Sequence, residues 1–145
     1  MRVFFYMETY SMLVFSYKII AIGVRTEGES KIFTEWDLGG EDKLVSKFYG
    51  YLNSKLDEVY RNNLKYFSKN SYSLEKMEVY GFNITRFDIP LLIQKGVEYS
   101  VGSLSDLTSK WMDMYVTDFS QVLLPFLNLH NKACTWETFL RYSQR

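Results

Sequence analysis

The feature that most constrains the fold is a nearly continuous apolar run between Lys18 and Arg25. A strand that is apolar at both alternating positions is covered on both faces, so other elements have to form layers above and below it. Two further strands are expected beside it, at Arg2–Glu8 and Ser30–Thr34, where β-forming residues gather. The segment Thr26–Glu29 contains Gly28 and predicts a hairpin turn.

The spacing of apolar residues changes after Leu38-Gly39-Gly40. From Glu41 to Leu56 they recur on one helical face, which predicts a helix. Residues 57–76 are polar, and we expect them to form a partly helical surface excursion. The remaining expected elements are a strand at Met77–Phe82, a helix at Asp88–Gln94 ended by Lys95-Gly96, a helix at Ser103–Met112, a strand at Met114–Asp118, and helices at Phe119–Phe126 and about Thr135–Tyr142.

This order of elements predicts an α/β fold with a mixed sheet. Three strands joined as a meander, followed by strands linked through helices, give a sheet with helices on its faces. The chain has 145 residues, which is the usual size of one domain. No linker divides it, so we expect residues 1–145 to form a single domain.

The overall charge limits the kinds of partner. The 17 basic and 17 acidic residues cancel, whereas a dedicated duplex-binding protein usually has a strong basic excess. Any nucleic-acid binding must therefore depend on a local patch. The single cysteine, Cys134, excludes a disulfide within the chain.

The N-terminal residues do not resemble a signal peptide, because Glu8 interrupts the apolar stretch and no small-residue cleavage site follows. The longest apolar run, Met12–Val24, contains Lys18 and is shorter than the ~20 residues that cross a bilayer. We therefore expect a cytoplasmic protein that does not enter membranes.

Two short segments carry the candidate chemistry. The first, Tyr6-Met7-Glu8-Thr9, places an acid at the end of the first expected strand. The second runs from Asn83 to Leu91 and places Asp88 at the start of a helix that follows the fourth strand. Strand ends of this kind are where α/β sheets bind their ligands.

These segments resemble the two first motifs of the DEDD family of 3′–5′ exonucleases, and in particular its polymerase-B-type members from archaea and viruses. The family's first motif is Asp-x-Glu-Thr on a strand, and its second, Asn-x-x-x-Phe-Asp-x-Pro-x-Leu, agrees with Asn83 to Leu91 throughout. The resemblance implies a ribonuclease H-like mixed sheet, an antiparallel meander plus parallel strands, flanked by helices. It also implies host cytoplasm as the location if the source is a virus.

The family's four carboxylates hold two Mg²⁺ or Mn²⁺ ions, ~3.5–4 Å apart, that activate water and stabilise the leaving oxygen. Glu8 and Asp88 correspond to two of the four and are the expected metal ligands and catalytic acids. Tyr6 stands where the family has its first Asp, and a neutral phenol is a poor Mg²⁺ ligand. The last-motif Asp is also missing, and Asp118 is the candidate third catalytic acid. Metal binding is therefore expected to be weak and cleavage slow or absent.

The second segment also contains the candidate residues for nucleic-acid binding, Asn83, Arg86 and Phe87. A cation beside an aromatic ring can hold the stacked bases of a single strand. The alternatives are that Phe87 packs in the core, that Asn83 binds the backbone of a turn, and that Asp88 is a helix N-cap. Glu8 can equally be an ordinary surface acid.

Three functions remain open at this point. The first is a degenerate exonuclease-like domain that binds single-stranded DNA or RNA, or a protein. The second is an active Mg²⁺- or Mn²⁺-dependent exonuclease with a substitute ligand. The third is a structural or assembly protein, for instance a homodimer formed through surplus tyrosines (Tyr49, Tyr51, Tyr60, Tyr66 and Tyr72).

Overall fold

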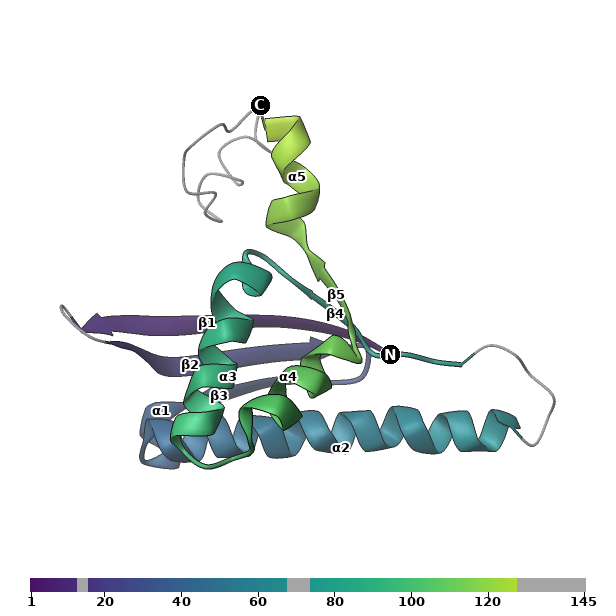
Figure 1. Cartoon of the computed structure of the whole chain (residues 1–145), viewed down its shortest axis with the longest axis horizontal. Coiled ribbons are helices and arrows are strands. Elements are labelled where there is room, and N and C mark those ends of the chain that lie inside the picture. The colour runs from purple at the N-terminus through teal and green to yellow at the C-terminus, as the bar shows by residue number, and fades with distance from the viewer. Residues whose placement is uncertain (13–15, 68–73, 128–145) are drawn as a thin grey trace.

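The computed structural model describes residues 1–12, 16–67 and 74–127, and it contains a five-stranded mixed sheet flanked by helices (Figure 1). The strands lie in the order β3-β2-β1-β4-β5. Neighbouring strands are antiparallel in the pairs β1/β2 and β2/β3 and parallel in the pairs β1/β4 and β4/β5. Their bounds are Arg2–Met12, Ser16–Thr26, Ser30–Thr34, Glu78–Gly81 and Tyr115–Asp118, from β1 to β5. The expected ribonuclease H-like arrangement, a meander extended by parallel strands, is confirmed.

The helices lie on both sides of this sheet. The long helix α2 runs along one face, and α5 rises from the other (Figure 1). Within the described residues, no helix is long and apolar enough to cross a membrane. The bounds are Glu35–Leu38 for α1, Glu41–Phe67 for α2, Ile84–Asp88 for the π-helix η1, Ile89–Glu98 for α3, Leu104–Met112 for α4 and Phe119–Leu127 for α5. The helix expected near residues 135–142 lies outside the described residues.

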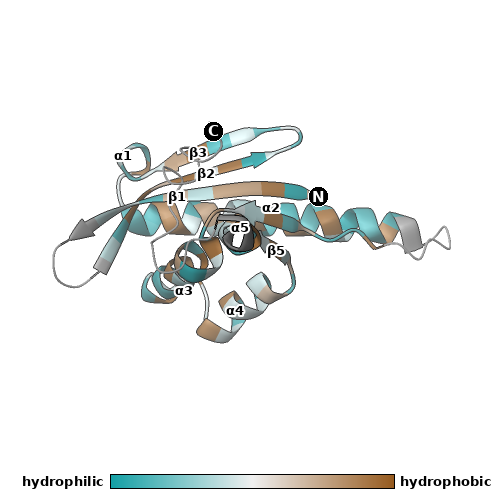
Figure 2. Ribbon diagram, turned by 90° about the horizontal axis from the view of Figure 1, so that it is seen from above, coloured by the Kyte–Doolittle hydropathy of each residue, from teal (hydrophilic) through white to brown (hydrophobic). Residues whose placement is uncertain are grey.

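The main core lies between the sheet and α2, α3 and α4. Phe5 of β1 is buried with its ring centroid 5.9 Å from the rings of both Phe48 on α2 and Trp111 on α4. Brown and teal alternate along α2 in Figure 2, as expected for a helix with one apolar side. The buried apolar residues of the second expected strand, Ile19, Ile22 and Val24, join this core.

Helix α2 is longer than the apolar spacing predicts. It continues through polar residues to Phe67, where a surface excursion was expected after Leu56. Val59 keeps the extension in contact with the protein, since it is buried. The Asn63 side chain exchanges two hydrogen bonds of 2.8 Å with the backbone of Glu75 and so fixes the returning chain.

The expected helix end at Lys95-Gly96 is wrong, because α3 continues to Glu98. A Cβ atom at position 96 would lie 2.6 Å from Leu107 Cδ1 and 3.0 Å from Tyr49 Cε2. Glycine at this position therefore allows α3 to approach α2 and α4 closely. Lys95 is buried and pairs with Glu41 at 3.6 Å and Glu98 at 3.0 Å.

Candidate acidic centre

The carboxyl ends of the parallel strands meet at one edge of the sheet, and Gly81 sets how closely they meet. A Cβ atom at position 81 would lie 2.8 Å from the carbonyl oxygen of Phe5 and 2.5 Å from Ile84 Cγ2. Only glycine therefore lets β4 end this close to β1. Asn83 follows with a φ of 61°, a left-handed conformation that asparagine tolerates better than most residues. The π-helix η1 then contacts both β1 and β5 and ends at Asp88.

Asp118, the last residue of β5, is buried and saturated with hydrogen bonds. One oxygen accepts from the backbone N–H of Asn83 at 2.8 Å and from the N–H and hydroxyl of Ser120 at 3.0 and 2.7 Å. The other accepts from the N–H and hydroxyl of Thr85 at 3.0 and 2.6 Å. Asp118 thus joins the turn after β4 to the start of α5.

These donors determine the charge state of Asp118. Burial alone would raise the pKa of this carboxyl, but the hydroxyls of Thr85 and Ser120 and the backbone amides of Thr85 and Asn83 offset it and hold the pKa below its usual range. Asp118 is 4% exposed, so these donors, rather than water, solvate its charge. A carboxylate offers about four lone-pair positions. Five donors fill them, which disfavours the expected role of Asp118 as a third metal ligand.

Asp88 is buried as well, at 8% exposure, but its surroundings supply no donor. It has helical backbone angles at the junction of η1 and α3, and its side chain makes no capping hydrogen bond. The N-cap interpretation is therefore wrong. Among the residues that the structure describes, nothing donates a hydrogen bond to this carboxyl.

The charge state of Asp88 is opposite to that of Asp118. Burial raises the pKa of Asp88 from its ordinary value of 3.8 to about 7, and the nearby carboxylates of Asp118 and Glu8 contribute to the rise. Because the carboxylate of Glu8 contributes to this rise in pKa, Glu8 lies close enough to Asp88 to repel its charge. The opening strand and the start of α3 therefore lie on the same side of the molecule, as the sequence motifs require.

Glu8 lies on the exposed side of β1. Side chains alternate along a strand, so Glu8 shares a face with Phe4 and Tyr6, opposite buried Phe5. Glu8 pairs with Ala21 of β2, whereas the next residue, Thr9, pairs with Ile19. This bulge leaves Ile20 of β2 unpaired beside Glu8 of β1. Bulges are frequent beside active sites.

Tyr6 fills the position of the missing acid with a ring that packs on β2. It pairs with Gly23, and a Cβ atom at position 23 would lie 2.0 Å from Tyr6 Cε1. The phenol ring therefore covers the glycine, as aromatic side chains do on neighbouring strands. The side chain is 47% exposed and offers a flat apolar surface where the family has a metal ligand.

The three residues expected to bind nucleic acid lie along one turn. Phe87 is half-buried, packs against the core and meets Tyr17 edge to face, with centroids 4.9 Å apart. The core interpretation of Phe87 is therefore confirmed. Arg86 is exposed on η1, and Asn83 contributes its backbone N–H to Asp118. Their contact with nucleic acid stays a prediction.

The sequence interpretation overlooked Thr85 and Ser120, whose hydroxyls complete the surroundings of Asp118. Ser120 follows the aspartate by two residues, and aspartates often bind backbone two residues further on. That spacing was a usable signal. Thr85 had none, because 33 residues separate it from Asp118 and only the fold brings them together.

An aromatic surface extends from the acidic centre across the sheet face opposite α2, which we call the open face. Phe4 stacks on Tyr80 with centroids 5.2 Å apart, and Tyr80 stacks on Phe119 at 6.0 Å. Together with Tyr6, Arg25 and Ile32 these residues line a depression of about 520 Å³. Phe4 and Tyr6 are nearly half exposed, so the surface is open to a ligand.

The acidic centre offers few oxygen ligands for a metal ion among the described residues. Across residues 1–12, 16–67 and 74–127, no three His, Cys, Asp or Glu side chains are placed to hold an ion together. Mg²⁺ requires near-octahedral oxygen coordination. Asp88 and Glu8 are the carboxylates whose oxygens accept no described hydrogen bond, and they could contribute two of those ligands.

Comparison of the chain with protein-family models, with curated proteins and with solved structures found no match.

Proposed function

We propose that this chain is an exonuclease-like domain with an impaired acidic centre, which binds single-stranded nucleic acid and cleaves it slowly or not at all. One observation carries the proposal: Asp88 is buried, accepts no hydrogen bond from the described residues, and has its pKa raised by burial and by the nearby carboxylates of Asp118 and Glu8. Burying a carboxyl without a donor is costly, and such groups cluster at functional sites. A centre built for cations explains why this acid is there.

The same centre lacks what two-metal cleavage needs. A pair of ions requires bridging carboxylates that are free to bind. At the position of one such carboxylate the chain has Tyr6, whose ring packs on Gly23. The oxygens of Asp118 already accept five hydrogen bonds. Glu8 and Asp88 alone would hold one ion weakly, which supports binding without efficient cleavage.

The open face supports the binding part of the proposal. Its exposed rings begin two residues before Glu8 on the same face of β1, and base–aromatic stacking stabilises single strands by about 1–3 kcal/mol per base. Arg25 is exposed beside Phe4, its partner in the neighbouring strand, and supplies a cation. A single strand crossing Tyr6, Phe4 and Tyr80 would therefore end near the acidic centre.

The test uses 5′-labelled single strands of DNA and of RNA with Mg²⁺ or Mn²⁺. Fluorescence anisotropy measures binding, and gel analysis of the same samples measures shortening. We expect binding that Tyr80→Ala weakens at least about fivefold through the lost stacking, with little shortening. Stepwise shortening that Asp88→Asn abolishes would instead show an active exonuclease. Absence of binding to both nucleic acids would reject the proposal, and Asp113→Asn, at an exposed acid just after α4, is the control.

Assembly through protein contacts is the second candidate, and the open face favours it too, because exposed aromatic rings are common in protein interfaces. Of the tyrosines expected to form a dimer face, Tyr49 is 1% exposed and belongs to the core, whereas Tyr60 is 64% exposed. Tyr72 lies outside the described residues, and the dimer stays a prediction. Sedimentation at two concentrations, with and without a single strand, separates the candidates. A dimer that Phe4→Ser dissociates, with no affinity for nucleic acid, would favour assembly.

A further inference from the structure

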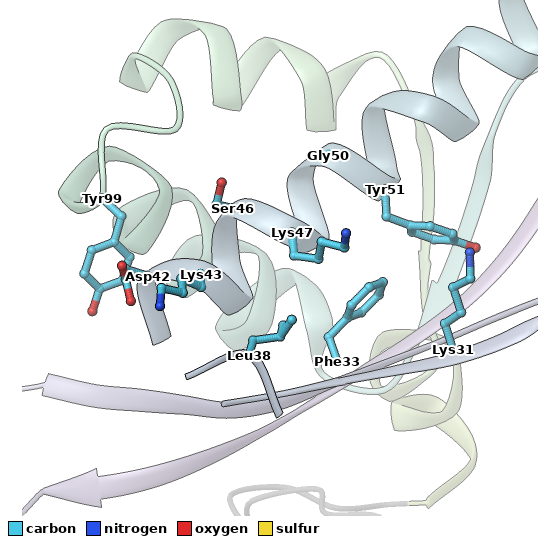
Figure 3. A pocket seen from close by; sticks show the side chains of 10 residues that line it. All are labelled: Lys31, Phe33, Leu38, Asp42, Lys43, Ser46, Lys47, Gly50, Tyr51 and Tyr99. Atoms are coloured by element: carbon cyan, nitrogen blue, oxygen red, sulfur yellow. The ribbon is translucent and has the colours of Figure 1, made fainter. Parts of the chain in front are cut away.

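A second concave site, which we call the lysine groove, lies between α2 and β3 (Figure 3). Its volume is about 790 Å³, within the range of small-molecule pockets. Its lining includes Lys31, Phe33, Lys43, Lys47, Gly50 and Tyr51. None of these residues belongs to the acidic centre, although Lys31 also lines the depression on the open face. The groove is therefore separate from the acidic centre.

The groove has a net positive lining. Lys43 and Lys47 lie one turn apart on α2, and Figure 3 shows their ammonium groups pointing in opposite directions along the groove. Among the described residues neither has an ion-pair partner. Lys31 is partly neutralised by Glu29 at 2.9 Å. Asp42 is the acid in the lining, and its carboxylate lies over Gly40. An extended anion along the groove would offset the charges of the two lysines.

Gly50 provides a second, independent observation. It is exposed in the interior of α2, where glycine is less favourable than alanine. A Cβ atom at position 50 would meet nothing within 4 Å, so packing does not require glycine there. Gly81 and Gly96, in contrast, are enforced by close neighbours. An uncrowded glycine that lines a groove leaves the helix backbone open to close approach by a ligand.

The opposite side of the groove is aromatic. Phe33 and Tyr51 have ring centroids 5.6 Å apart with their planes inclined at 56°. The ammonium of Lys31 lies 4.7 Å from the centre of the Tyr51 ring. Figure 3 shows Phe33 and Tyr51 beside Lys47, whereas Lys43 lies toward the other end of the groove, near Asp42 and Tyr99. The groove thus offers cations along the helix and an aromatic end beside Lys47.

We propose that the lysine groove binds a nucleotide, with its phosphates at Lys43 and Lys47 and its base or sugar against Phe33 and Tyr51. Ammonium groups spaced along a groove suit the oxygens of a chain of phosphates, and aromatic rings suit the face of a base. A free nucleotide and a nucleotide within a single strand share this chemistry. The experiment separates the two sources.

The experiment titrates the full chain with ATP in EDTA by calorimetry and with a labelled oligothymidylate by anisotropy. We expect ATP binding, which the double variant Lys43→Gln/Lys47→Gln weakens about tenfold or more, through the loss of two charge-assisted contacts. Arg61→Gln, a cation on the same helix outside the groove, should bind as the unaltered chain does. If the double variant also binds the oligothymidylate more weakly, the ligand of the groove is a single strand. If it binds only ATP more weakly, the ligand is a free nucleotide.

Gly50→Ala separates a ligand site from an ordinary solvated helix face. The added methyl should raise the melting temperature by about 2–4 °C through helix propensity, yet weaken binding at least about threefold by blocking close approach. Ser54→Ala, one turn further along α2, should leave binding unchanged. The proposal is overturned if the chain binds neither probe, or if the lysine and glycine variants bind both probes as the unaltered chain does. Asp88→Asn should not change ATP binding, so failure of the groove and failure of the acidic centre remain distinguishable.

Discussion

Asp118 and Asp88 lie at the same edge of the sheet, and both are almost fully buried. Asp118 receives five hydrogen bonds from three residues, and these donors hold its pKa below the usual range despite its burial. Asp88 receives none from the described residues, and burial raises its pKa to about 7. The contrast shows that the surroundings of an acid, rather than its place in a motif, decide whether it stabilises the fold or remains available to a ligand.

The largest expected effect is on the acid that holds the fold together. Asp118→Ala should lower the free energy of unfolding by about 4 kcal/mol, because it removes charge-assisted hydrogen bonds and leaves buried amides without an acceptor. Chemical denaturation measures this loss. Asp113→Ala, at an exposed position, should change stability by less than about 0.5 kcal/mol. A comparably small loss at Asp118 would show that the hydrogen bonds add little.

Asp88→Asn should raise the free energy of unfolding at high pH, whereas Asp118→Ala lowers it. A raised pKa means that the folded protein binds the proton more tightly than the unfolded chain does, so stability from Asp88 falls as pH rises from about 4 to about 7. The size of this pKa shift limits the stability gained by Asp88→Asn at high pH to about 4 kcal/mol. Relaxation of the residues around Asp88 should reduce the gain to about 2 kcal/mol. We therefore expect Asp88→Asn to be more stable than the unaltered chain at pH 8 and to lose this advantage at pH 4.

The lowered pKa of Asp118 predicts a pH dependence of the other sign. Its contribution to stability is present above about pH 4 and is lost as the pH falls below that value. Denaturation curves of Asp88→Asn and Asp118→Asn between about pH 3 and pH 8 test both pH dependences together. Parallel pH profiles for the two variants would contradict the assignment of separate roles.

Tyr6→Asp should produce the smallest change in stability and a gain in metal binding. Removing the ring from Gly23 should cost about 1 kcal/mol, the scale of a cross-strand aromatic contact. A carboxylate on the same strand face as Glu8 should raise Mn²⁺ affinity about tenfold, as calorimetry would measure. Tyr6→Phe keeps the ring and should alter neither property. If Tyr6→Asp binds Mn²⁺ no better than the unaltered chain, the centre is not a remnant metal site.

The mixed sheet flanked by helices was predictable, because the apolar run of β2 and the change to helical spacing after it are local signals. The strand β3 has the expected bounds, Ser30–Thr34, since a turn precedes it and the change to helical spacing follows it. The full length of α2 was not predictable from apolar spacing, because Asn63 stabilises its end through Glu75, on the far side of the loop.

The role of Asp118 was not predictable for a similar reason. Its surroundings combine a serine two residues away with a turn that precedes it by more than thirty residues. Sequence spacing also cannot distinguish a glycine that ends a helix from one that admits a neighbouring helix, as at Gly96. In both cases the deciding contacts come from elements distant in the chain.

Asp88 is a buried carboxyl that accepts no hydrogen bond from the described residues, whereas the nearby Asp118 carboxyl is fully hydrogen-bonded. Carbon-13 NMR titration of the aspartate carboxyl groups, assigned with Asp88→Asn and Asp118→Asn, measures both directly. The account predicts a midpoint near pH 7 for Asp88 that Mg²⁺ lowers only slightly, and a midpoint below about 4 for Asp118. A midpoint near pH 4 for Asp88 in the absence of metal would contradict it.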